Sequence, residues 1–296
     1  RHDCLGSHRL RPRDLAMNAI KIGPFPIPYD RFFLLLAILV IGVVAELVGR
    51  RTNNKAVTAW GWNVGFVAAL VARLGFVLTH LSDFLPQPLS IFFIWQGGFS
   101  LLWGVVGGVA YTLWFFRKEP QLLRNTLLPV VAVTGVWVTS QIMAVSNGST
   151  SHQVLPSLTL YRLDGSEVAL ESFKGKPLVI NVWATWCPPC RREMPMMNEV
   201  AAANPEVTFL FVDQGEDAAT VEAFINSIDM PGDTVLLDPG LEFSRGQGMV
   251  GYPTTFFYDA SGQRVSVRFG ELSRATVNDQ VERLRKTEQL ETTATP

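Results

Sequence analysis

Four long apolar stretches between residues 31 and 146 constrain the fold of this chain more than any other feature of its sequence. A membrane-spanning helix needs about 20 mostly apolar residues, and each stretch is near that length. Four in a row, joined by short polar loops, argue against the buried helices of a water-soluble protein. We therefore predict four spans, at Phe32–Val48, Val57–Leu78, Leu89–Phe116 and Leu127–Val145.

The charges of the connecting loops predict which side of the membrane each loop occupies. Three basic residues lie between the first and second stretches, at positions 50, 51 and 55, and three more between the third and fourth, at positions 117, 118 and 124. The loop Ser82–Gln87 has no Lys or Arg. Because basic loops stay in the cytoplasm, everything after Val145 should lie outside it. This pattern predicts a multi-pass protein of the bacterial inner membrane whose C-terminal half faces the periplasm.

The first 16 residues do not fit this orientation, because they carry four arginines. We interpret Met17 as the native start and the residues before it as a tag or a misassigned leader, in which case Cys4 is absent from the native protein. N-terminal sequencing of the native protein would test this hypothesis. No signal-peptide pattern precedes Phe32, so the first span would act as the export signal.

Net charge changes sign between the two halves of the chain. Residues 1–150 carry 13 Lys and Arg against 6 Asp and Glu, whereas residues 151–296 carry 12 against 20. A basic apolar half and an acidic soluble half fit a membrane protein with an external domain, and neither half has the basic stripe of a nucleic-acid binder. The three cysteines, Cys4, Cys187 and Cys190, are too few for a disulfide scaffold or a four-ligand zinc site, so we expect no metal.

Several motifs in the apolar half resemble the N-terminal helices of prolipoprotein diacylglyceryl transferase, over about residues 20–118. These motifs are Ile22-Gly23-Pro24 followed by Arg31-Phe32-Phe33, the run Ala72–Val77, and the run Ile94–Ser100. The family's outward-facing N-terminus agrees with the orientation that the loop charges predict.

The positions that carry the family's chemistry differ in this chain. Where the family has an aromatic residue and a functional histidine after Gly-Gly-x-Ser, this chain has Leu101 and Leu102, and Phe33 replaces a functional tyrosine. Of the cations that an anionic lipid headgroup requires, only Arg73 remains. The resemblance therefore implies an inactive anchor for residues 31–146, in contact with membrane lipid. The alternative is a lipid-modifying transferase with an appended soluble domain.

The soluble half begins after a short polar linker, residues 147–156, and alternates between strand and helix patterns. Leu178–Trp183 is a continuous apolar run of the kind buried in a central strand. We expect further strands at Leu158–Arg162, Val207–Val212, Thr234–Leu237, Thr254–Tyr258 and Arg264–Arg268, and helices at Glu193–Ala203, Ala218–Ile228 and Arg274–Arg285. A βαβ unit followed by a hairpin and a closing helix predicts an α/β thioredoxin-like domain over residues 157–288, with a tail at 289–296.

The segment from Trp186 to Cys190 (Trp-Cys-Pro-Pro-Cys) carries the predicted chemistry of this domain. A buried strand ends at Trp183 and a helix begins near Cys187, which places the Cys187 sulfur over a helix N-terminus. Unpaired N–H groups and the helix dipole there favour the thiolate. Cys190 lies one turn later and can resolve a mixed disulfide, and Pro188 and Pro189 are tolerated in a first turn. The alternative is a merely structural cysteine pair in an adhesion module.

Residues 156–288 resemble the TlpA/ResA group of extracytoplasmic thioredoxin-like proteins. The likeness rests on Leu170–Phe173 with Gly175-Lys176-Pro177, on the cysteine box with Glu193-Met194-Pro195 after it, on Val212–Glu216, and on Tyr252-Pro253-Thr254-Thr255. It implies that Pro253, which lies between Tyr252 and Thr254 in the chain, is a cis-proline packed against the active disulfide. It also implies a carboxylate near the buried thiol at Glu216, with Asp213 a weaker candidate. The alternative for Glu216 is a solvated residue at a helix start.

The same resemblance implies a thiol–disulfide oxidoreductase that uses its redox-active disulfide and no other cofactor. Reduction of disulfides in substrate proteins, apocytochrome c among them, is favoured over oxidation or isomerisation. Cys187 would attack and Cys190 would close the ring, with Trp186 as a supporting residue. Since no cysteine lies in any predicted span, a reductase would need a separate membrane electron donor of the DsbD/CcdA kind.

Overall fold

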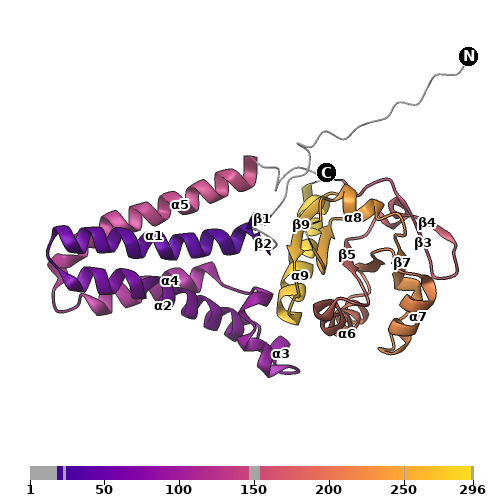
Figure 1. The fold of residues 1–296 in the computed structure, drawn as a ribbon, viewed down its shortest axis with the longest axis horizontal. Helices are drawn as coiled ribbons and strands as arrows, with labels where there is room; N and C mark the ends of the chain where they lie inside the picture. Colours follow the sequence, from indigo (N-terminus) through magenta and orange to yellow (C-terminus); the bar gives the residue numbers. More distant parts are fainter. Residues whose placement is uncertain (1–18, 23–24, 147–153, 250, 295–296) are drawn as a thin grey trace, which may run out of the picture.

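A computed structural model describes residues 19–22, 25–146, 154–249 and 251–294 of the chain. The predictions concerning Met17 and Cys4, and most of the predicted linker, lie outside the described residues. A helical half and an α/β half lie end to end (Figure 1), as the sequence predicts.

The helical half opens with a small hairpin of β1 (Ala19–Ile22) and β2 (Phe25–Pro28), followed by α1 (Tyr29–Arg51) and α2 (Lys55–Thr79). Short turns α3 (Leu81–Phe84), η1 (Pro88–Phe92) and η2 (Ile94–Gln96) lead to α4 (Leu101–Phe115), η3 (Pro120–Thr126) and α5 (Leu127–Ser146). Of the described helices, three are long and apolar enough to cross a membrane: α1, α2 and the helical run Pro120–Ser140. Helix α4 is apolar but shorter.

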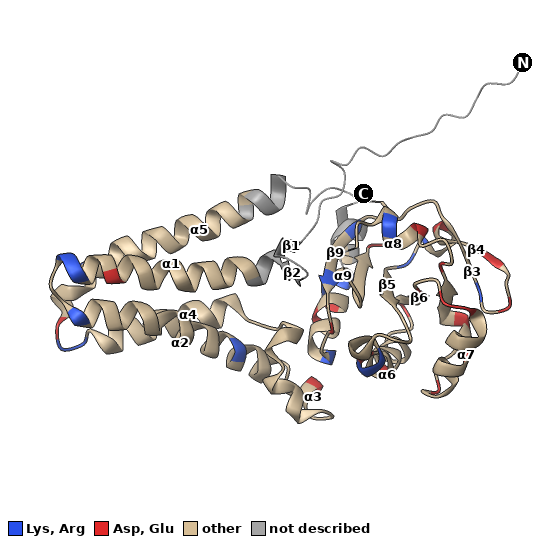
Figure 2. Ribbon diagram, viewed as in Figure 1, with Lys and Arg blue, Asp and Glu red and all other residues tan. Residues whose placement is uncertain are grey.

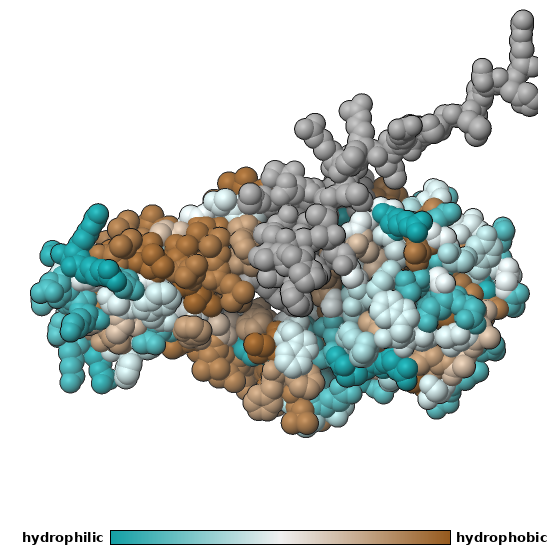
Figure 3. Space-filling model, viewed as in Figure 1, coloured by the Kyte–Doolittle hydropathy of each residue, from teal (hydrophilic) through white to brown (hydrophobic). Residues whose placement is uncertain are grey.

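The main helices of this half pack closely around α2, which contacts both α1 and α4. A Cβ atom on Gly61 would lie 2.1 Å from the Cβ of Ala45, so only glycine allows α1 and α2 to approach this closely. The buried Trp60 indole donates a hydrogen bond to Thr112 of α4 at 3.0 Å. The outward faces are largely apolar, and this half is mostly brown in Figure 3. Lys and Arg residues gather at the end remote from the α/β half (Figure 2).

The third predicted span, Leu89–Phe116, is not one continuous helix. Gly97 and Gly98 have φ angles of +79° and +81°, in the left-handed region, and they separate the turns η1 and η2 from α4. A Cβ atom on Gly98 would lie 2.5 Å from the Phe76 ring, so a larger residue would not fit there. The first part of this apolar stretch therefore forms a folded loop at the end of the helical half that faces the α/β domain.

The α/β half contains a seven-stranded sheet in the order β4-β3-β7-β6-β5-β8-β9. Strands β5, β6 and β7 are parallel, and the remaining pairs are antiparallel. The strands are β3 (Thr159–Tyr161), β4 (Glu167–Ala169), β5 (Leu178–Trp183), β6 (Thr208–Asp213), β7 (Val235–Leu237), β8 (Thr254–Tyr258) and β9 (Arg264–Phe269). Strand β4 was not predicted, whereas β5 and β8 have the predicted bounds.

Each face of the sheet is buried under its own apolar cluster. Side chains of α6 (Pro188–Ala203), α7 (Ala218–Asn226) and α9 (Arg274–Ala294) cover one face, together with Val179 and Trp183 of β5. Ile180 and Val182 of β5 point to the other face, where η4 (Leu170–Phe173) and α8 (Glu242–Gly246) pack. A short turn, η5 (Gly232–Thr234), precedes β7. Helix α9 runs to Ala294, through most of the predicted tail. This arrangement is the predicted thioredoxin-like fold.

Candidate functional site

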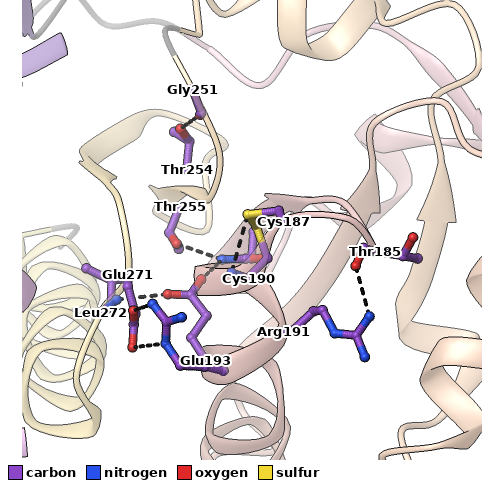
Figure 4. The surroundings of a disulfide bond; sticks show 12 residues. Thr185, Cys187, Cys190, Arg191, Glu193, Gly251, Thr254, Thr255, Glu271 and Leu272 are labelled. Atoms are coloured by element: carbon purple, nitrogen blue, oxygen red, sulfur yellow. Dashed lines mark hydrogen bonds and ion pairs between the residues drawn. A yellow bond between two sulfur atoms is a disulfide. The ribbon is translucent and has the colours of Figure 1, made fainter. Parts of the chain in front are cut away.

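The Cys187–Cys190 disulfide lies at the N-terminus of α6 (Figure 4). Cys187 is the N-cap residue, and its Sγ accepts a hydrogen bond from the Cys190 N–H at 3.3 Å. Pro188 and Pro189 occupy the first turn, where helical N–H groups have no partner, as the sequence predicts. The Cys187 sulfur therefore lies where the helix dipole favours a thiolate. The sulfurs differ little in exposure, since both cysteines are buried.

Aromatic side chains border the disulfide on the solvent side. Trp186 is 60% exposed although it directly precedes the buried Cys187. Its ring contacts the Tyr252 ring edge-on, with centroids 5.9 Å apart. An exposed indole beside a reactive disulfide offers an apolar contact surface to another protein.

The loop before β8 lies at the same end of the sheet as the disulfide. Thr254 pairs with Val182, one residue from the end of β5, which brings residues 251–253 close to the start of α6. The Tyr252–Pro253 peptide bond is cis, as the resemblance implied. The Thr254 hydroxyl donates a hydrogen bond to the Gly251 carbonyl at 2.6 Å, and the Gly270 N–H donates one to the Pro253 carbonyl at 2.8 Å. These bonds fix the loop beside the cysteine pair (Figure 4).

Glu193 is a buried carboxyl near the disulfide that the sequence analysis did not select as a site residue. It lies three residues after Cys190 on α6 and is 2% exposed. Its Oε1 accepts a hydrogen bond from the Asn181 side chain at 2.7 Å, and its Oε2 accepts one from the Leu272 N–H at 2.8 Å. Burial raises the pKa of Glu193 from 4.5 to about 8, against the effect of these hydrogen bonds. The group therefore holds a proton at neutral pH and can release it in the range where thiols titrate.

Two sequence signals could have identified this carboxyl. The spacing of three residues places Glu193 on the same side of α6 as Cys190. Asn181 is the only polar residue in the apolar run Leu178–Trp183, and a polar side chain in a buried strand needs a partner. That partner is Glu193, together with the Thr255 hydroxyl, which accepts from the Asn181 amide at 3.0 Å.

Glu216, the predicted carboxylate, contacts the loop that leads into the cysteine box. Its two carboxylate oxygens accept hydrogen bonds from the Thr185 N–H at 2.6 Å and the Thr185 hydroxyl at 2.5 Å. Thr185 precedes Cys187 by two residues, so Glu216 fixes the backbone just before the disulfide. Its predicted effect on a thiol stays a prediction.

Asp213 lies behind Glu216, at the end of β6. It is fully buried and accepts hydrogen bonds from the N–H groups of Gly215 and Glu216. Burial raises the pKa of Asp213, and the neighbouring Glu216 carboxyl adds to the rise. The Glu216 carboxyl thus lies close enough to make loss of the Asp213 proton less favourable.

Arg73, the residue that a lipid-binding site would have used, makes its hydrogen bonds to backbone. Its guanidinium donates to the carbonyl oxygens of Ser90, Ile91, Gly97 and Gly98, and these contacts use all five of its N–H groups. The side chain is 5% exposed. Arg73 therefore holds the folded loop against α2, which favours a structural role for this residue.

Within residues 19–22, 25–146, 154–249 and 251–294, no group of three or more His, Cys, Asp or Glu side chains could hold a metal ion.

Comparisons with known proteins divide the chain in the same place as the structure. Residues 150–282 match the Redoxin family, and residues 17–148 match the prolipoprotein diacylglyceryl transferase family. A thiol-disulfide oxidoreductase ResA from Bacillus thuringiensis subsp. konkukian is 30% identical over 131 residues, which cover 44% of this chain and 75% of that protein. ResA from Geobacillus thermodenitrificans is 29% identical over 177 residues, 57% of this chain and 99% of that protein.

Part of the chain is also similar to solved structures. The structure of MTB DsbF in mixed oxidised and reduced forms has 32% sequence identity and a TM-score of 0.41, and the match covers 43% of this chain and 95% of that one.

Proposed function

This chain belongs to the ResA family of thiol-disulfide oxidoreductases, and from that premise we propose that it reduces disulfides of substrate proteins on the periplasmic side of the bacterial inner membrane. The observation that carries the proposal is the Cys187–Cys190 pair, which caps α6 beside the exposed Trp186. Cys187 is the attacking sulfur and Cys190 the resolving one.

The reaction transfers two electrons from the cysteine pair to the substrate. The Cys187 thiolate attacks one sulfur of the substrate disulfide, forms a mixed disulfide, and releases the other substrate sulfur as a thiolate that takes up a proton. Cys190 then loses its proton and attacks the Cys187 sulfur. The Cys187–Cys190 disulfide forms, and the second substrate sulfur leaves and is protonated. The substrate is reduced and the pair is oxidised, which is the state that the structure contains.

Glu193, ionised while the pair is reduced, supports this sequence as the group that accepts the Cys190 proton. Cys190 is fully buried, so its proton needs a nearby acceptor when the thiol becomes a nucleophile. A carboxyl whose pKa is raised to about 8 keeps that proton while the disulfide exists. When a donor reduces the pair again, the departing Cys190 thiolate can recover the proton from Glu193.

The helical half provides the proposed membrane anchor. Three helices of suitable length, the match to a membrane enzyme family and the basic residues gathered at the remote end in Figure 2 support an orientation with the α/β domain outside the cytoplasm. Because residues 31–146 contain no cysteine, a separate membrane protein of the DsbD/CcdA kind would supply the electrons. Apocytochrome c is one candidate substrate.

The test is the redox state of the pair in living cells. Acid quenching followed by thiol labelling should find Cys187 and Cys190 mostly reduced, and deletion of every membrane electron donor should leave them oxidised. A pair that is mostly oxidised in wild-type cells would instead identify an oxidase of the same fold. In membrane vesicles, the reduced full chain should reduce insulin, and the Cys187→Ser variant should not.

A further inference from the structure

We infer that the folded loop of the helical half, residues 81–100, forms part of the redox site. In this role Gln96 positions the ion pair of Arg192 and Glu271 beside Glu193. We call this segment the docking loop. The inference rests on the proposed function, because it concerns how the buried carboxyl beside the cysteine pair is set.

The docking loop contacts the first turns of α9 and the segment just before it through three side-chain hydrogen bonds. The Gln96 amide donates to Glu271 Oε1 at 3.0 Å, and the Thr276 hydroxyl donates to the Gln96 carbonyl at 3.3 Å. The Asn278 amide donates to Asp83 Oδ1 at 2.9 Å. Gln96 is 5% exposed, so the contact is enclosed. The short helix α3 lies near the lower end of α9 in Figure 1, as these bonds require.

The residues that the docking loop contacts are connected to Glu193 by hydrogen bonds. Glu271 Oε2 accepts a hydrogen bond from Arg192 Nη2 at 2.5 Å, and Arg192 is the neighbour of Glu193 on α6. The residue after Glu271, Leu272, donates its N–H to Glu193 (Figure 4). A movement of the Glu271 backbone would therefore alter the hydrogen bond to the buried carboxyl. Gln96 holds the Glu271 carboxylate from the other half of the chain.

A pocket between the two halves brings the charged groups around Glu193 together. Arg192 comes from α6, Glu271 and Arg274 from the segment that begins α9, and Asp83 from α3. The polar and charged side chains that line this pocket include Asp83, Gln96, Arg192, Glu193, Glu271 and Arg274. With the loop docked, the helical half forms one wall of the pocket beside Glu193. With the loop released, water would reach the carboxyl from that side.

Arg73 fixes the backbone of the docking loop where the loop borders the pocket. Its five hydrogen bonds tie the loop backbone to α2, and the buried Phe76 and Phe84 pack with Ala275 of α9. A shift of α2 would therefore move the loop and, through Gln96, Glu271. The hydrogen bond that Leu272 donates to Glu193 would change with it. Hydration would lower the pKa of Glu193 towards its ordinary value, because burial is the main cause of its rise.

The test compares full chains in detergent micelles. Cys4 is replaced by Ser, so that the measured thiols come only from the Cys187–Cys190 pair. The equilibrium between oxidised and reduced pair in glutathione buffers is measured from pH 5.5 to 9.5. A group that changes its proton binding with the redox state produces a break in the pH dependence of this equilibrium. In Gln96→Ala the break should move to lower pH by about 0.5–1 unit, because water that enters beside Glu193 stabilises its ionised carboxyl.

Two further variants keep the test decisive. Asn278→Ala weakens the same contact without touching Glu271 and should move the break in the same direction. Ser82→Ala changes an exposed polar residue of the same loop that does not line the pocket, and it should leave the break in place. The inference is overturned if Gln96→Ala follows the wild-type curve, or if Ser82→Ala shifts as much. A wild-type pair that does not exchange with glutathione at any pH would instead refute the proposed function.

Discussion

Replacing Glu193 by Gln should make the α/β domain less sensitive to alkaline pH. The glutamine amide has nearly the shape of a protonated carboxyl and can accept the Leu272 hydrogen bond. Asn181 can turn its side-chain amide to accept from the new N–H, since its Oδ1 has no hydrogen-bond partner among the described residues. The substitution therefore removes an ionisable group with little change in packing.

The magnitude follows from the difference in proton affinity between the folded and unfolded chain. Burial raises the pKa of Glu193 from 4.5 to about 8. Because the pKa of Glu193 is higher in the folded chain than in the unfolded chain, the protonated group stabilises the fold. This stabilisation is fully present below pH 4.5 and is lost as the pH rises through about 8. Between these limits the folded form holds a proton that the unfolded form has released, so stability falls by about 1.4 kcal/mol per pH unit. Over the whole window the loss is roughly 5 kcal/mol.

The assay is urea unfolding of the oxidised full chain in micelles, followed by brief proteolysis at pH 5.5, 6.5, 7.5 and 8.5. With a typical urea dependence, each pH unit should move the midpoint of the wild type relative to Glu193→Gln by roughly 0.5–1 M. A matched control is Glu222→Gln on α7, whose side chain is exposed in the folded chain and whose curve should follow that of the wild type. Parallel curves for the wild type and Glu193→Gln across this range would refute the argument.

Three other substitutions have definite expected outcomes. Cys190→Ser should trap substrates as mixed disulfides on Cys187, visible as reducible high-mass bands that the double variant with Cys187→Ser lacks. Trp186→Ala should raise the KM for protein substrates about tenfold through loss of its exposed contact surface while leaving the equilibrium with glutathione unchanged, and an unchanged KM would exclude this role. Arg73→Met removes five hydrogen bonds to the docking loop and should make the loop more sensitive to protease, and Arg73→Lys should have an intermediate effect. Equal protection of the loop in the wild type and both variants would contradict a structural role for Arg73.

The sequence was most informative where local pattern alone determines structure. The apolar run Leu178–Trp183 became a central strand with the predicted bounds, because both of its faces are buried. The Cys187 N-cap was also predictable, since the strand end, the prolines and the helix pattern all agree on it. The same reasoning overestimated the helix at Leu89–Phe116. Hydropathy reports the composition of a stretch, whereas the break at Gly97 depends on a buried arginine 24 residues earlier.

Glu193 shows a different limit of sequence reasoning. At its position a glutamate on a helix would ordinarily be exposed and hydrated. Its burial depends on the Leu272 N–H, 79 residues away, and on a strand asparagine that faces inward. Such a long-range arrangement leaves only a weak local signal, the single polar residue in an apolar strand. Likewise, the Gln96–Glu271 contact joins residues 175 positions apart, in the two different halves of the chain.

The buried Glu193 carboxyl also affects how this protein can be engineered. A search for heat-resistant variants would favour its replacement by an apolar residue, because burying an ionisable group lowers stability at neutral and alkaline pH. The same replacement would remove the proton acceptor proposed for Cys190. Variants selected for thermal resistance alone should therefore accumulate changes at this position and lose turnover. Selection should combine heating with a turnover assay, so that robust but inactive variants are discarded.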